Sequence, residues 1–301
     1  MRVMTARPID PKANPAVIRA KVNRMARKFS RLPSGIDIET TEIEGMSAEW
    51  LRPKNLNNAT SPDETLLYLH GGGYILCGPD THRGMVATMA KNARLNALVI
   101  DYRLAPENPF PAAVDDALKA YRWLIARGTP ASAITVAGDS AGGGLTLALL
   151  MALRDAGDPL PAAATLLSPW TDLAMSGWSH ITHRKLDPML SVEGALLGAR
   201  HYLGTASPTT PLASPLYGQF EGLPPLLIHV GSNEILLDDS LRLAERARAA
   251  GVSVELKIWQ DLPHVFQAAQ FVPEARAALS EIGAFLRLNL SESPIKNQAA
   301  E

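Results

Sequence analysis

The chain has 301 residues, of which 47% are hydrophobic and 20% are charged, and a chain of this length can bury a large core without disulfide or metal supports. Its 29 Lys and Arg residues nearly balance its 30 Asp and Glu residues, which argues against a basic surface that binds nucleic acid. The single cysteine, Cys77, excludes an internal disulfide and a multi-cysteine zinc site.

The N-terminal segment, residues 1–15, lacks the apolar stretch of a signal peptide. The most apolar run, Leu145 to Leu153, is too short to span a bilayer and is interpreted as a core helix. We therefore expect a cytoplasmic protein without a membrane anchor.

The predicted elements begin with one or two basic amphipathic helices within residues 1–35, followed by a pair of strands, Ile36 to Ile43 and Ala48 to Leu51, around Gly45. From Thr65 onward, short apolar strands alternate with helices. Such alternation predicts a mostly parallel sheet covered by helices on both faces. The strands are expected over 66–69, 97–100, 134–137, 163–167, 226–230 and 252–259, and the helices over 81–94, 112–127, 141–156, 193–202, 239–250 and 273–288.

One polar, Pro- and His-containing stretch, from Thr171 to Pro215, interrupts this alternation. We interpret it, together with the N-terminal helices, as a small helical cap over the end of the sheet where ligands bind in such folds. The expected organisation is an N-terminal part of the cap (1–45), an α/β core (46–170 and 216–291), a cap insertion (171–215) and a polar tail (292–301).

A candidate nucleophile lies between a predicted strand and a predicted helix, in the pattern Gly138-Asp-Ser140-Ala-Gly142. A sharp strand-to-helix turn places the serine in a strained conformation, and only small neighbours such as Gly138 and Gly142 let the two elements approach closely. The N–H of Ala141, at the start of the helix, faces the same space and favours negative charge there. The alternative is a glycine-rich turn with a capping serine.

A second glycine loop, His70-Gly71-Gly72-Gly73, follows the strand 66–69. Consecutive glycines let the backbone present N–H donors to an anionic group such as a tetrahedral acyl intermediate. The sequence lacks the Lys-Ser/Thr of a P-loop and the Gly-x-Gly-x-x-Gly of a dinucleotide site here, which argues against both.

Four motifs in order, His70-Gly-Gly-Gly-Tyr, Asp101-Tyr-Arg-Leu-Ala-Pro-Glu, Gly138-Asp-Ser-Ala-Gly-Gly and Ser168-Pro-Trp-Thr-Asp-Leu, resemble the hormone-sensitive-lipase-like family of α/β-hydrolases, in its bacterial Gly-Asp-Ser-Ala-Gly branch. The resemblance covers about residues 60 to 290. It implies the α/β-hydrolase fold, a serine esterase for small acyl esters with a cap domain, and no cofactor. It also implies that Gly72 and Gly73, together with Ala141, form the oxyanion hole.

The base and the acid of a triad are expected after Ser140, because this fold carries them in the order Ser, acid, His. His264 has the required place, in a loop between the last strand and the last helix. The loop after strand 226–230 offers Glu234, Asp238 and Asp239. Glu234 is the preferred acid, although the family commonly has Asp at this place, and both aspartates can alternatively cap the following helix.

Two other signals are interpreted as structural. His180 and His183 are one helical turn apart but have no evident third metal ligand. Cys77 has no base placed for it and is interpreted as a small buried side chain.

The sequence thus favours a serine carboxylesterase that cleaves short to medium acyl esters through an acyl-enzyme. The alternatives are a lactone hydrolase or metabolite deacetylase with the same triad, and a non-catalytic ligand receptor on the same fold. The partner is a small-molecule ester. The strand 252–259, if it is a sheet edge, could pair with a second copy in a homodimer.

Overall fold

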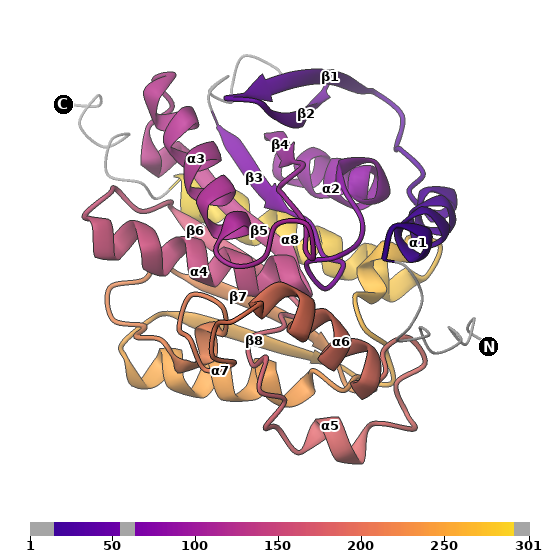
Figure 1. Ribbon diagram of the computed structural model, residues 1–301. Helices are drawn as coiled ribbons and strands as arrows, with labels where there is room; N and C mark the ends of the chain where they lie inside the picture. The colour runs from indigo at the N-terminus through magenta and orange to yellow at the C-terminus, as the bar shows by residue number, and fades with distance from the viewer. Residues whose placement is uncertain (1–14, 55–63, 292–301) are drawn as a thin grey trace.

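An eight-stranded sheet runs through the centre of the molecule, with helices packed on both of its faces (Figure 1). The structure, a computed structural model, describes residues 15–54 and 64–291. The strands are β1 (Ile36–Ile43), β2 (Met46–Pro53), β3 (Thr65–Leu69), β4 (Asn96–Ile100), β5 (Ile134–Asp139), β6 (Ala163–Leu167), β7 (Leu226–Gly231) and β8 (Val254–Trp259).

The strand order is β1-β2-β4-β3-β5-β6-β7-β8, and β8 lies at one edge. β2 is antiparallel to β1 and β4, whereas the strands from β4 to β8 are all parallel. The carboxyl ends of the parallel strands therefore meet at one end of the sheet, where a ligand site is expected in an open α/β fold.

The helices divide between the two faces of the sheet according to the alternation of the strand side chains. Leu67 and Leu69 of β3 belong to the core with α3 and α4, whereas Leu66 and Tyr68 belong to the core with α2 and α8. A third cluster packs α7 and α4 against β6 and β7. These helices are α2 (Pro79–Ala93), α3 (Ala112–Ala126), α4 (Ala141–Ala156), α7 (Leu237–Ala249) and α8 (Pro273–Ser291).

Three more helices, α1 (Pro15–Phe29), α5 (Ser179–Thr182) and α6 (Val192–Leu203), lie outside these layers (Figure 1). The predicted helix within residues 1–35 is confirmed from Pro15 onward, while residues 1–14 and the expected tail at 292–301 lie outside the described residues. β1 is hydrogen-bonded to β2 in the main sheet. The segment 1–45 was predicted to be the N-terminal part of the cap. Among its described residues, those before Ile36 lie outside the sheet, and those from Ile36 to Ile43 belong to it.

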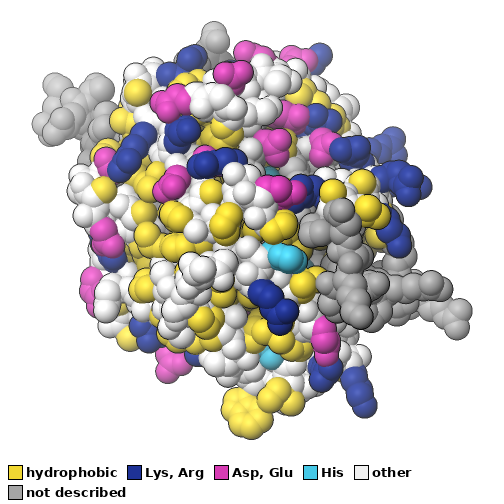
Figure 2. Space-filling view, in the orientation of Figure 1, with side chains coloured by type: hydrophobic (Ala, Val, Ile, Leu, Met, Phe, Trp, Pro, Cys, Tyr) yellow, Lys and Arg dark blue, Asp and Glu magenta, His cyan; other side chains and the backbone are white. Residues whose placement is uncertain are grey.

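The short helix α5 has one buried side and one exposed apolar side. Ser179 and His180 are buried against α7, whereas Trp178 and Ile181 are exposed by 74% and 68%. Apolar side chains accordingly form the lower tip of the molecule in the space-filling view (Figure 2). No helix among the described residues is both long and apolar enough to cross a membrane.

Candidate active site

Ser140 occupies a sharp turn between β5 and α4. Its backbone has φ 53° and ψ −121°, a conformation that costs energy for a residue with a side chain. A Cβ atom on Gly138 would overlap the carbonyl oxygen of Gly142, and one on Gly142 would overlap that of Leu69. The strand, the helix and the neighbouring loop therefore touch backbone to backbone, as the spacing of the two glycines predicts.

The glycine loop at 70–73 packs directly against this turn, because a Cβ on Gly142 would also lie 2.6 Å from the His70 carbonyl oxygen. Gly72 and Gly73 have φ values of 119° and 63°, which favour glycine. Within the described part of the chain, their N–H groups donate no hydrogen bond. Ala141 begins α4, so its N–H has no acceptor within the helix.

Asp139, the residue before Ser140, anchors the glycine loop to the turn at Ser140. This role was not predicted from the sequence. Its buried carboxylate accepts hydrogen bonds from Gly71 N at 2.9 Å and from the Tyr68 hydroxyl at 2.7 Å, and it lies 3.3 Å from His82 Nε2. Burial alone would raise the pKa of Asp139, but the His82 charge and these hydrogen bonds lower it to about 2. The carboxylate is therefore ionised, and it fixes the start of the loop.

His70 is a structural residue of the same loop. Its ring is fully buried and stacks on Tyr102 with ring centroids 4.2 Å apart. Nδ1 donates to the Gly71 carbonyl oxygen at 2.8 Å. Burial and the charge of His82 lower the pKa of His70 to about 3, so the ring is neutral.

His264 and Glu234 meet at the carboxyl ends of β8 and β7. His264 Nδ1 lies 2.7 Å from Glu234 Oε2, and both residues are buried. Burial would lower the pKa of His264, but its hydrogen bond to Glu234 and the charge of that carboxylate outweigh this effect and raise it. The arrangement can hold the imidazole with Nδ1 protonated and Nε2 available as a base.

The end of β6 connects this pair to Ser140. Ser140 N donates to the Leu167 carbonyl oxygen at 2.8 Å. The next residue, Ser168, donates from Oγ to Glu234 Oε1 at 2.9 Å. In the sequence, Ser168 stands out only as part of a family motif, because its contact to Glu234 joins residues 66 positions apart.

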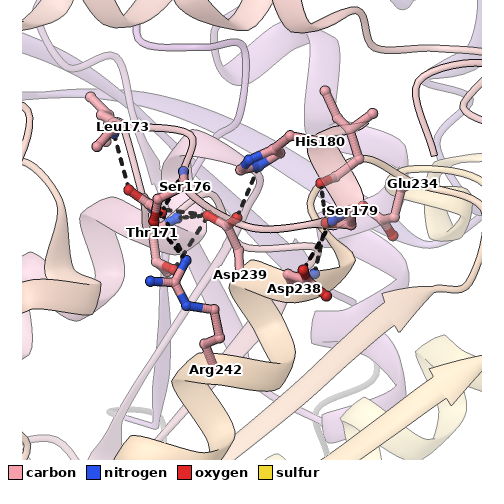
Figure 3. Close-up of polar contacts among 12 residues, drawn as sticks. Thr171, Leu173, Ser176, Ser179, His180, Glu234, Asp238, Asp239 and Arg242 are labelled. Atoms are coloured by element: carbon pink, nitrogen blue, oxygen red, sulfur yellow. Dashed lines mark hydrogen bonds and ion pairs between the residues drawn. The ribbon is translucent and has the colours of Figure 1, made fainter. Parts of the chain in front are cut away.

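Asp238 and Asp239 do not cap α7 with their side chains, which corrects the helix-capping alternative. α7 begins at Leu237 and its N-cap has no side-chain hydrogen bond. Figure 3 shows both aspartates turned toward the segment 171–180 instead. Asp238 Oδ2 accepts from Ser179 N at 2.9 Å, and Asp239 Oδ2 accepts from Thr171 N at 2.8 Å.

The two residues discounted as metal ligands have separate partners. His180 Nε2 lies 3.3 Å from Asp239 Oδ1, whereas His183 Nδ1 lies 2.8 Å from the Thr182 hydroxyl. Among the residues that the structure describes, no group of three His, Cys, Asp or Glu side chains could hold a metal ion. Cys77 is half-buried, not buried as expected, and desolvation raises the pKa of its thiol to about 12, which disfavours its thiolate.

Comparison with known proteins places this geometry in a family. Residues 66–268 match the sequence model of a protein family whose description is alpha/beta hydrolase fold. The chain is 47% identical over 247 residues to an acetyl-hydrolase of Streptomyces hygroscopicus, covering 82% of this chain and 81% of that protein. It is 34% identical to an esterase of Acinetobacter venetianus, covering 90% and 88% of the two chains.

Solved structures agree. The chain superposes on an esterase from the bacterial hormone-sensitive lipase family with a TM-score of 0.88, 45% identity and 93% of each chain covered. It superposes equally well, at 40% identity over 95% of each chain, on a structure of EstE5 soaked with p-nitrophenyl butyrate. The chain therefore belongs to the hormone-sensitive lipase family of α/β-hydrolases and is a serine esterase that hydrolyses carboxylic esters.

Proposed function

We propose that the enzyme cleaves esters of short to medium acyl chains through an acyl-enzyme on Ser140, with His264 as the base and Glu234 as the acid of the triad. The observation that carries the proposal is the 2.7 Å contact between His264 Nδ1 and Glu234 Oε2. The end of β6 connects this pair to the strained turn at Ser140, through Leu167 and Ser168. Glu234 is favoured over Asp238 because the Asp238 carboxylate accepts from Ser179 N.

In the first half-reaction, Ser140 Oγ attacks the ester carbonyl while His264 Nε2 takes its proton. Glu234 holds the Nδ1–H tautomer and stabilises the imidazolium. The tetrahedral intermediate collapses when His264 returns the proton to the leaving alcohol. Water, activated by His264, then attacks the acyl-enzyme, and Ser140 is regenerated with release of the carboxylic acid.

The negative oxygen of each tetrahedral intermediate is bound by the N–H groups of Gly72, Gly73 and Ala141. Support comes from the conformations of the two glycines and from the lack of an acceptor for their N–H groups within the described residues. Donors fixed before the reaction act most strongly, because they need no reorganisation when charge develops. The Asp139 contact to Gly71 N supplies that rigidity.

The acyl pocket is roofed by a cap built from the N-terminal segment and the insertion 171–215, over a core formed by 46–170 and 216–291. α1, α5 and α6 lie outside the sheet–helix layers, which supports this division (Figure 1). The N-terminal contribution to the cap lies before Ile36, where β1 begins.

The test is hydrolysis of p-nitrophenyl esters from acetate to laurate by the wild type and by Ser140→Ala. We expect kcat/KM to fall with chain length and the Ser140→Ala variant to lose at least about 10³-fold in kcat, since it removes the nucleophile. Ser280→Ala, at an exposed position of α8 outside the proposed site and cap, serves as the matched serine control. A folded Ser140→Ala enzyme with wild-type turnover would refute the proposal.

Deacetylation of an acetylated metabolite is the second candidate. The relative that is 47% identical over most of both chains carries the name acetyl-hydrolase, which favours an acetyl ester as the substrate. A sharp preference for acetate over butyrate in the ester series would support this narrower activity, because a deacetylase pocket has room for two acyl carbons only.

A further inference from the structure

Ser168 occupies the first position after β6, between the nucleophile turn and the acid–base pair. Its side chain is fully buried, and its backbone has a φ of 46°, in the left-handed region. Ser168 N donates to the His229 carbonyl oxygen at 2.7 Å, which ties this strained residue to β7. A glycine would adopt the same backbone conformation at a lower conformational energy. The presence of a serine at this position therefore indicates that its side chain has a role.

The Ser168 hydroxyl contacts both loops that carry the acid and the base. Oγ donates to Glu234 Oε1 at 2.9 Å and accepts a hydrogen bond from Val265 N at 3.2 Å. Val265 directly follows His264 and has a φ of 48°. One hydroxyl thus joins the carboxylate of Glu234 to the backbone that positions the His264 ring.

Glu234 uses its two oxygens for different purposes. Oε1 accepts from Ser168 Oγ and from Gly231 N, while Oε2 faces His264 Nδ1. Because Oε1 has two donors, rotation of the carboxylate would break both bonds. The longer side chain of Glu, compared with Asp, therefore remains in one orientation.

We propose that Ser168 is a positioning residue for the acid–base pair: its hydroxyl fixes the Glu234 carboxylate and the His264 loop in one arrangement. This inference rests on the proposed function of Glu234 and His264. The hydroxyl also acts electrostatically. Its positive end points at the carboxylate, so it weakens the pull of Glu234 on a proton at His264.

Loss of the hydroxyl should therefore move the titration of His264 as well as slow the reaction. The charged groups that act on His264 are Glu234, Asp187 and Asp139. A change at Ser168 removes none of these three charges, and Gly231 N still donates to Glu234 Oε1. What His264 loses is the hydroxyl dipole that opposes its protonation. The pKa of His264 then rises, and the acid limb of the kcat/KM profile moves to higher pH.

The test compares Ser168→Ala, Ser168→Gly and Ser168→Cys. Alanine and glycine both remove the hydroxyl, but glycine also relieves the strain of the left-handed backbone. Cysteine keeps the shape and replaces a strong donor by a weak one. We expect all three to lower kcat, alanine and glycine by about tenfold to a hundredfold, with little change in KM. The acid limb should shift upward in each.

Thr165→Val is the matched control, because Thr165 lies on β6, the strand that Ser168 follows, is fully buried, and has a hydroxyl without a hydrogen-bond partner among the described residues. It should keep the wild-type kcat and pH profile. Folding is checked by circular dichroism, and Ser168→Cys decides the question if the smaller side chains destabilise the protein.

Two results would overturn the inference. One is a wild-type kcat and acid limb in the folded Ser168 variants. The other is full activity in Ser168→Gly with loss only in Ser168→Ala, which would assign the effect to backbone strain. Failure of the proposed function looks different, since the wild type would then hydrolyse no ester or Ser140→Ala would remain active.

Discussion

At the scale of single residues, the contacts of two neighbouring carboxylates decide which of them we propose as the acid of the triad. Glu234 is fully buried and faces His264, whereas the Asp238 carboxylate accepts from Ser179 N. We expect Glu234→Gln to lower kcat by about 10³- to 10⁴-fold, because an amide does not stabilise the imidazolium. Asp238→Asn should change kcat by only about twofold, since its oxygen still accepts from Ser179.

Steady-state kinetics on p-nitrophenyl butyrate measure both variants, and the unfolding temperature shows whether each is folded. The two substitutions are a matched pair: each replaces one carboxylate by its amide within the same loop and helix start. A large loss in Asp238→Asn with little change in Glu234→Gln would transfer the acid role to Asp238.

Residues with a local pattern could be predicted from the sequence, whereas those defined by long-range contacts could not. Ser140 lies in a strand–turn–helix pattern, and His264 has a definite place in chain order. Asp139 and Ser168, in contrast, act on partners 68 and 66 positions away. The residues next to Asp139 and Ser168 in the sequence give no sign of these distant contacts.

At the scale of elements, the segment 171–180 is held to the first turn of α7 by a buried carboxylate (Figure 3). Asp239 Oδ2 accepts from Thr171 N and Asp172 N at 2.8 and 2.9 Å, and Oδ1 lies 3.3 Å from His180. Asp239→Ala would leave these buried groups without an acceptor. We expect it to lower the free energy of unfolding by about 3 kcal/mol.

Urea unfolding followed by circular dichroism measures this loss. Glu245→Ala is the control, because Glu245 lies on the exposed side of the same helix and should shift stability by no more than about 0.5 kcal/mol. Equal stability of the two variants would mean that the contacts of Asp239 do not hold the segment.

Regular elements followed the hydrophobic periodicity closely, including α6 (Val192–Leu203) in the insertion, predicted at 193–202, whereas the short helix α5 did not. The strands Ile36–Ile43 and Ala163–Leu167 and the helix Ala141–Ala156 have the predicted bounds, and Gly157 ends that helix with a φ of 73°. α5 was not predicted, because its four residues are too few to show a helical period. Asp238 and Asp239 carried a capping signal, but their contacts to the segment 171–180 prevailed.

At the scale of the whole molecule, the parallel strands bring together residues from distant parts of the sequence. β3, β5, β7 and β8 end next to the glycine loop, Ser140, Glu234 and His264 respectively. The alternation of strands and helices predicts this convergence, because it requires a parallel sheet. It does not predict how α1 packs, since an amphipathic helix carries no signal for its partner.

α1 contacts two loops through polar side chains: the one that follows the proposed oxyanion glycines and the one that follows β4. Arg19 donates to the carbonyl oxygens of Ile75 and Ala105 at 2.9 and 3.0 Å, and Asn23 Oδ1 accepts from Cys77 N at 3.0 Å. If α1 also forms part of the pocket roof, removing residues 1–30 should raise the relative rate for long esters, because a wall of the acyl pocket is lost.

The ratio of kcat/KM for laurate to that for butyrate measures this effect in the truncated and full-length enzymes. Arg19→Ala is the companion variant: it removes polar contacts to the loop but leaves α1 in the chain. It should lower kcat for all esters alike without changing the ratio, since in the proposed mechanism the loop next to Gly72 and Gly73 acts on the reacting carbonyl and not on the acyl tail. An unchanged ratio after truncation, in a folded enzyme, would show that the roof is formed by the insertion 171–215 alone.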